Sequence, residues 1–321
     1  MTEPTSPRWS LSGLIRPFVI GVVIAAGAYA ALALLSDWES TAAAARAVPV
    51  SAVLAALLAS TGNFVLRWAR WALYLRRLGV SVPLADSILV FLAGFSMSLT
   101  PGKVGELLKP ALLHDRHGTP LEPVGSVVIA ERITDLLAVA ALLGVGALAA
   151  PQVAAIAGLV WLGVGVGVAV LVSPRLAGLV VRVVERLPAG DRLGGIVTRL
   201  LDSLRDLSRP ATLVPALLLS VGAWGLQCLS LYLIAAPMAG LSLSPLASIL
   251  AYTAPLLAGA GALVPGGVGV AEATMAGLLT QLGGAGIADA AAATAIVRAV
   301  TLWWAVALGL GALIGWSFRR A

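Results

Sequence analysis

The sequence predicts an all-α polytopic membrane protein with about six full transmembrane helices and two re-entrant helical hairpins in an inverted repeat. Three observations support this prediction: an apolar composition, two apolar segments broken by Pro-Gly turns, and a Glu/Arg spacing that occurs twice. Of the 321 residues, 60% are hydrophobic and 11% are charged, and the mean hydropathy is +0.99. Such a composition is typical of a polytopic membrane protein.

Apolar runs of about the roughly 20 residues that a bilayer requires predict the full spans. They lie near 14–35, 49–66, 124–149, 153–172, 211–236 and 291–316. The run 14–35 is expected to be an uncleaved anchor, and 153–172 an extra span. Arginines follow the second run at Arg67, Arg70, Arg76 and Arg77, and they are frequent again in 173–210. Basic connections favour the cytoplasmic side, so we expect both termini and an amphipathic connection 173–210 there, in a cell (plasma or inner) membrane.

Two further apolar segments, 84–113 and 246–283, are each broken near the middle. After the first break only the run 107–113 remains before charged residues, and seven residues rise about 10 Å as a helix, too little to cross a core of about 30 Å. Each segment is therefore predicted to be a re-entrant hairpin. Backbone broken out of a helix in a bilayer needs partners in protein or in a polar cavity, so the turns indicate a binding site. The turn residues are Pro101, Gly102 and Gly105, then Pro265, Gly266, Gly267 and Gly269.

An acid and a base recur at the same separation in both halves. Glu106 precedes Arg132 by the same distance along the chain as Glu272 precedes Arg298, since 132 − 106 equals 298 − 272. We interpret 1–321 as one membrane domain with repeat 1 at 49–149 and repeat 2 at 211–316. The hairpins are expected to enter from opposite faces, an arrangement typical of transporters with a midplane site.

Ionisable side chains within membrane spans are candidate binding groups. Each costs roughly 2.5–3.5 kcal/mol on insertion scales, so it normally faces a cavity or a partner. Buried ion pairs that hold the halves together are the alternative explanation. Asn63, Arg67 and Arg70 share one helix face, which we expect at the inner membrane edge. The first candidates are Glu106, Arg132, Glu272 and Arg298, and the second set is Lys103, Lys109, Asn63, Arg67, Arg70, Glu131 and Asp135.

Four ordered motifs resemble the lysylphosphatidylglycerol synthase transmembrane-region family, the flippase-like part of multiple peptide resistance factors. They are Asn63-x-x-x-Arg67-x-x-Arg70-Trp71, Pro101-Gly102-Lys103-x-Gly105-Glu106-x-x-Lys109, Glu131-Arg132-x-x-Asp135, and Pro265-Gly266-Gly267-x-Gly269-x-x-Glu272 with Arg298. The resemblance implies lipid translocation. It argues against lipid synthesis by this chain, because no soluble aminoacyl-transferase domain follows the membrane part.

The leading hypothesis is a flippase that moves a phospholipid, an aminoacylated phospholipid or a polyprenyl-linked lipid between leaflets. A small-solute or ion secondary transporter and a membrane-embedded lipid or glycan transferase are the alternatives. We expect no enzymatic activity, since no catalytic nucleophile or metal set is recognisable, and we expect no cofactor. Membrane lipids are the expected partners, and a separate lipid-modifying enzyme is another candidate partner. The net charge of +6 suits cytoplasmic loops better than nucleic acid.

Overall fold

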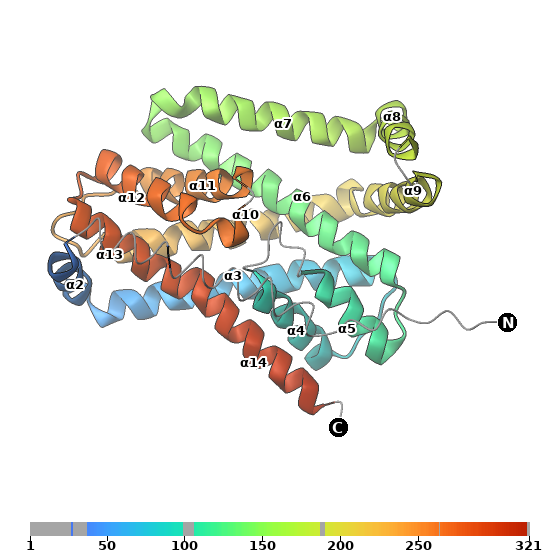
Figure 1. Cartoon of the computed structure of the whole chain (residues 1–321), viewed down its shortest axis with the longest axis horizontal. Helices are drawn as coiled ribbons and strands as arrows, with labels where there is room; N and C mark the ends of the chain where they lie inside the picture. Colours follow the sequence, from blue (N-terminus) through green and yellow to red (C-terminus); the bar gives the residue numbers. More distant parts are fainter. Residues whose placement is uncertain (1–26, 28–36, 99–105, 187–189, 263, 320–321) are drawn as a thin grey trace.

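The computed structural model describes residues 27, 37–98, 106–186, 190–262 and 264–319, and this part of the chain contains helices and no strand (Figure 1). The expected anchor 14–35 lies almost wholly outside the described residues, as do the first hairpin turn and Lys103. The first group of helices is α2 (Trp38–Ala47), α3 (Val50–Arg77), α4 (Leu84–Ala93) continued by a 3-10 turn (Gly94–Met97), α5 (Leu108–His117) and α6 (Leu121–Gly146).

The second group begins with α7 (Ala154–Val172) and ends at the C-terminal helix. Its other members are α8 (Pro174–Glu185), α9 (Gly190–Leu207), α10 (Pro210–Ala235), α11 (Pro245–Gly261), α12 (Val270–Gly283), α13 (Ile287–Arg298) and α14 (Trp304–Phe318). A π-helical turn, Ala299–Trp303, joins α13 to α14 into one long helix. Prolines at the starts of α10 and α11 suit the first helical turn, where a backbone N–H has no intrahelical acceptor.

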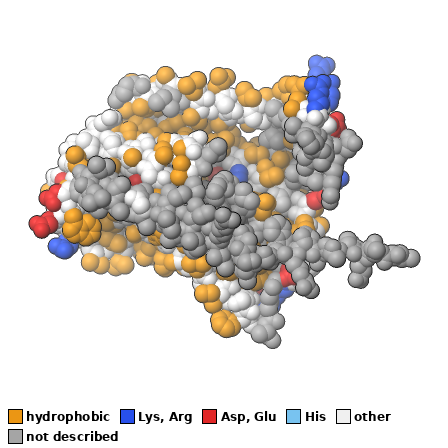
Figure 2. Space-filling view, in the orientation of Figure 1, with side chains coloured by type: hydrophobic (Ala, Val, Ile, Leu, Met, Phe, Trp, Pro, Cys, Tyr) orange, Lys and Arg blue, Asp and Glu red, His pale blue; other side chains and the backbone are white. Residues whose placement is uncertain are grey.

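Three described helices are long and apolar enough to cross a membrane: Val50–Arg77, Pro210–Ala235 and Ile287–Phe318. Their outward faces carry large exposed hydrophobic side chains, for example Leu58 on α3 and Leu218 on α10. Figure 2 shows hydrophobic side chains over much of the visible described surface, with charged side chains toward the two ends. Such apolar faces are favourable in contact with lipid, because lipid keeps them away from water.

The two halves of the chain pack in a reciprocal way. The first long helices, α3 and α10, cross each other in extensive contact, α6 packs against α11, and α14 packs against α4. Each of the last two contacts is close, because a side chain at Gly146 would meet the backbone of Leu250, and one at Gly309 would meet the backbone of Phe95. The second long helix of each half therefore touches the first arm of the broken segment in the other half.

The broken segments fold as pairs of short helices. Helices α11 and α12 pack against each other and lie toward the α2 end of the molecule, whereas α4 and α5 lie toward the opposite end (Figure 1). Their bounds agree with the predicted segments 84–113 and 246–283, except that α5 continues to His117.

The helix that contains the second predicted span is longer than the span. Helix α3 does not end near residue 66 but continues to Arg77, so Arg67 and Arg70 lie inside a helix and not in a connection. Both are buried, with Arg70 fully inaccessible, so their side chains face the protein interior. The expected amphipathic connection 173–210 consists of two helices, α8 and α9.

Candidate functional site

In the first half, Glu106 and Arg132 form an ion pair. Arg132 Nη2 lies 3.1 Å from Glu106 Oε2 and 2.9 Å from Asp135 Oδ2. Glu106 lies just before α5 and is buried, whereas Arg132 on α6 remains partly accessible. The arginine is therefore held from one side by two carboxylates and has an open side.

In the second half, the same separation brings Glu272 and Arg298 together. Arg298 Nε donates to Glu272 Oε1 at 2.6 Å, and Arg298 Nη2 donates to the carbonyl of Gly266 at 3.2 Å. The other carboxylate oxygen of Glu272 accepts from the N–H of Gly269 at 2.6 Å. The ion pair thus also fastens the start of α12 to the turn before it, because the carboxylate caps a free helical N–H.

Glycine is required at this turn. Gly266, Gly267 and Gly269 have φ values of 62°, 67° and 86°, which side chains with a Cβ rarely adopt. A Cβ on Gly259 of α11 would lie 2.9 Å from the Cα of Gly267. The two arms of the hairpin therefore meet backbone to backbone at its tip.

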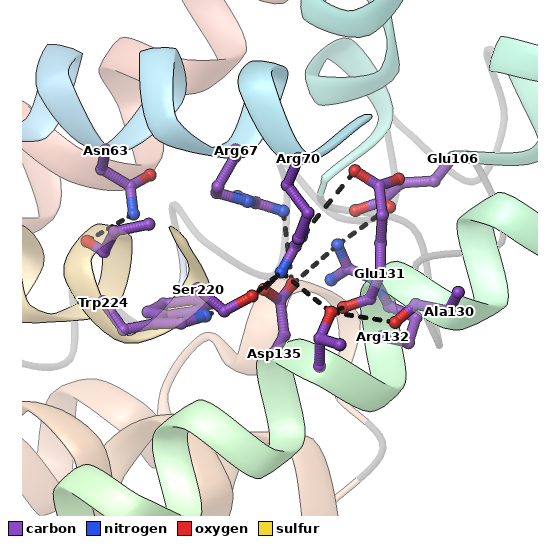
Figure 3. Close-up of polar contacts among 12 residues, drawn as sticks. Asn63, Arg67, Arg70, Glu106, Ala130, Glu131, Arg132, Asp135, Ser220 and Trp224 are labelled. Atoms are coloured by element: carbon purple, nitrogen blue, oxygen red, sulfur yellow. Dashed lines mark hydrogen bonds and ion pairs between the residues drawn. The ribbon is translucent and has the colours of Figure 1, made fainter. Parts of the chain in front are cut away.

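Around Arg132, charged side chains of α3 and α6 form a buried network (Figure 3). Arg70 Nη1 donates to Asp135 Oδ1 at 2.6 Å, to Ser220 Oγ at 2.5 Å and to Thr134 Oγ1 at 3.2 Å. Glu131 Oε1 lies 3.7 Å from Arg70 Nη2. These contacts join α3, α6 and α10, so Arg70 holds three helices together.

Lys109 on α5 extends the network to the first broken segment. Its Nζ lies 2.5 Å from Glu131 Oε2 and 3.8 Å from Glu106 Oε2. The ammonium also lies 4.7 Å from the centre of the Trp71 ring, a cation–π contact. Burial of the lysine is therefore compensated by two acids and an aromatic face.

Arg67 has a different environment from Arg70. Its guanidinium lies 5.0 Å from the centre of the Phe95 ring and 5.7 Å from that of Trp224. Its nearest ion pair, to Asp135 Oδ2, is long at 3.6 Å. Its Nε has no hydrogen-bond partner among the described residues, and leaving such a buried donor unsatisfied costs about 1–3 kcal/mol or more.

Asn63 does not join this network. Its side-chain amide donates to the carbonyl of Ala223 at 2.7 Å, which links α3 to α10 beside two other cross-links, Ser60 with Gln227 and Ser230 with Ala56. The Asn63 amide nitrogen therefore cross-links α3 and α10, whereas its Oδ1 has no hydrogen-bond partner among the described residues.

A cavity of about 320 Å³ connects the two halves. Arg132 and Arg298, the two repeated arginines, both line it, together with Asp135, Trp224 and the turn at Gly266 and Gly267. The remaining wall is apolar, from α6, α11, α12 and the turn between the last two: Leu136, Val139, Leu256, Leu257, Ala260, Val264 and Ala271. The cavity thus combines cationic groups with a hydrophobic wall.

Of the predicted site residues, the structure brings Arg132, Asp135, Arg298, Gly266 and Gly267 into the cavity wall. The two glutamates pair with the wall arginines, whereas Arg70, Lys109 and Glu131 form the network described above. Trp224 is not among the predicted site residues, yet its indole N–H donates to Asp135 Oδ1 at 3.0 Å. Its position in the middle of a span, away from the ends where membrane tryptophans gather, is the signal that could have identified it.

In the described part of the chain, membrane-length apolar helices and buried charges beside a cavity indicate an integral membrane protein. The family model described as the lysylphosphatidylglycerol synthase TM region matches residues 18–309, and the chain belongs to this family. Comparison with curated proteins gives no significant match. The family places the chain among membrane proteins connected with lipid modification or flipping.

Proposed function

We propose that this chain moves a lipid between the two leaflets by holding its head group in the central cavity. One observation carries the proposal: Arg132 and Arg298, each paired with the glutamate that precedes it at the repeated spacing, line the same otherwise largely apolar cavity. Guanidinium groups bind phosphate through paired N–H donors. The apolar wall suits the region of the lipid next to the head group.

In this proposal the halves are inverted repeats, 49–149 and 211–316, whose broken segments are re-entrant hairpins that enter from opposite membrane faces. The reciprocal packing of α6 on α11 and α14 on α4 supports it. Exchanging the conformations of the two halves would open the cavity alternately to each leaflet. Both chain termini are then cytoplasmic, on the side of the basic helices α8 and α9.

The glutamates have a defined role in this cycle. A phosphate that approaches Arg132 or Arg298 competes with the carboxylate already bound there, at 3.1 Å and 2.6 Å respectively. Because Glu272 also accepts from the N–H of Gly269, releasing Arg298 leaves the carboxylate bound to the turn. Head-group binding can therefore change the contacts of the hairpin tip without losing its cap.

Leaflet exchange in vesicles tests the proposal. The purified chain is reconstituted with a head-group-labelled phosphatidylglycerol, and exchange is followed by quenching the outer label with an impermeant reductant. We expect the double variant Arg132→Gln/Arg298→Gln to exchange the lipid at least about tenfold more slowly, the effect of losing roughly 1.4 kcal/mol of transition-state binding.

The matched control is Arg175→Gln/Arg182→Gln, which removes two arginines from α8, outside the cavity wall, and is expected to exchange lipid at the rate of the unchanged protein. Quenching of a label trapped on a soluble dextran inside the vesicles measures leakage. Equal exchange rates in the cavity variant and the unchanged protein, with both folded, would contradict the proposal.

A further inference from the structure

Arg67 differs from Arg70, Lys109 and Asp135 in its hydrogen bonding. Each of those three takes part in at least one hydrogen bond of 2.6 Å or less. No hydrogen bond from Arg67 is present within the described part of the chain, although its side chain is only 9% exposed. Burying a guanidinium in this way is unfavourable unless another group satisfies its donors.

The charges around Arg67 do not balance. Among the described residues of the network, the positive side chains are Arg67, Arg70, Lys109 and Arg132, and the negative ones are Glu106, Glu131 and Asp135. The Asp135 carboxylate is shared by three guanidinium groups, which lie at 3.6 Å (Arg67), 2.6 Å (Arg70) and 2.9 Å (Arg132). One positive charge is left over, and Arg67 has the weakest hold on the shared carboxylate.

Arg67 also lies directly behind the cavity wall. The two groups in front of it, Trp224 and Asp135, both line the cavity, and Figure 3 shows the Arg67 side chain extending from α3 toward Asp135, with Trp224 nearby. The centre of the Phe95 ring lies 5.0 Å from Cζ of the Arg67 guanidinium. An anion in the cavity beside Trp224 and Asp135 is therefore close enough to attract this cation with little solvent screening.

We propose that Arg67 makes the site selective for lipids whose head group is a phosphodiester with a net negative charge. This inference rests on the proposed function, because it takes the cavity as the place of the head group. An anionic phosphodiester in the cavity neutralises the surplus charge of the network behind the wall. A zwitterionic head group carries no net charge, so the surplus remains.

Competitive lipid binding tests the selectivity. The purified full-length chain in detergent is offered equal amounts of phosphatidylglycerol and phosphatidylcholine with identical acyl chains, and bound lipid is counted by native mass spectrometry. We expect the unchanged protein to prefer phosphatidylglycerol about tenfold, which corresponds to about 1.4 kcal/mol. Arg67→Gln is expected to abolish the preference, and the control Arg77→Gln, an exposed arginine on the same helix, to retain it.

The variant Arg67→Lys separates the positive charge from the planar shape of the guanidinium. It tests the selectivity even if Arg67→Gln does not fold. Lysine keeps the charge but lacks the planar fork, so we expect the preference for phosphatidylglycerol to persist. Loss of the preference in folded Arg67→Lys, an unaltered preference in folded Arg67→Gln, or equal binding of both lipids by the unchanged protein would overturn the inference.

Leaflet exchange of the same two lipids distinguishes this inference from the proposed function. Selective binding that depends on Arg67, without exchange of either lipid, would refute the proposed translocation and support the selectivity. Exchange of both lipids at equal rates, with equal binding, would support translocation and refute the selectivity.

Discussion

Replacing Glu272 and Arg298 by glutamine, singly and together, measures whether the repeated acid–base pair is one energetic unit. The pair is buried, with 4% and 10% of the two side chains exposed, and its atoms are 2.6 Å apart. Either single change leaves one charge buried without its counter-ion. Breaking a buried ion pair from one side costs about 3–5 kcal/mol.

The double variant is expected to lose no more stability than either single variant, because neither charge then remains. The amide oxygen introduced by Glu272→Gln can still accept from the N–H of Gly269, as the carboxylate does at 2.6 Å. The summed cost of the single changes should therefore exceed the cost of the double change by at least about 3 kcal/mol.

Unfolding of the four proteins in mixed micelles, followed by far-UV circular dichroism, provides the free energies of unfolding. The matched control is the exposed pair of Glu122 and Arg199, with 52% and 57% of the side chains accessible, for which we expect a coupling below about 1 kcal/mol. If the Glu272 and Arg298 costs add within about 0.5 kcal/mol, the two residues do not act as a pair and the reasoning about the site fails.

Two glycine contacts give further predictions with internal controls. Gly309→Ala should lower the unfolding free energy by about 1–3 kcal/mol through overpacking against the first broken segment, whereas Gly311→Ala, on the same helix with open space around it, should not. Gly259→Ala should cost about 1–3 kcal/mol at the hairpin tip, and Gly261→Ala, at the end of the same helix, should be neutral or stabilising. Thermal unfolding midpoints in detergent test both, and equal midpoints within either pair would contradict the packing described.

The helices and the two repeated ion pairs could be predicted from sequence because both depend on local pattern. Apolar runs and Pro-Gly breaks locate most helices within a few residues. The equal spacing in the two halves identified the acid and the base that pair in each, Glu106 with Arg132 and Glu272 with Arg298. In each half, the acid lies at the start of the second short helix of the broken segment and the arginine lies in the next long helix. The equal number of residues between them brings the two side chains into contact.

The network on α3 could not be predicted because it depends on packing between distant helices. Hydropathy ends the second span near residue 66, where arginines begin, yet α3 continues through Arg67 and Arg70. The helix can continue because acids on α6 neutralise these arginines. A hydropathy scale scores each residue by itself and so cannot include this pairing. Ser220 contributes to the same network from α10, and an isolated serine in an apolar span offers no sequence signal.

The shared carboxylate of Asp135 has a consequence for biogenesis. Helix α3 leaves the ribosome with Arg67 and Arg70 and no acid of its own, and each arginine opposes transfer into the bilayer by about 2.5–3.5 kcal/mol. The acids that offset this cost, Glu131 and Asp135, lie on α6 and are synthesised only after α4 and α5. Stable integration of α3 is thus expected to await α6, so that the two helices enter the lipid together rather than in order of synthesis.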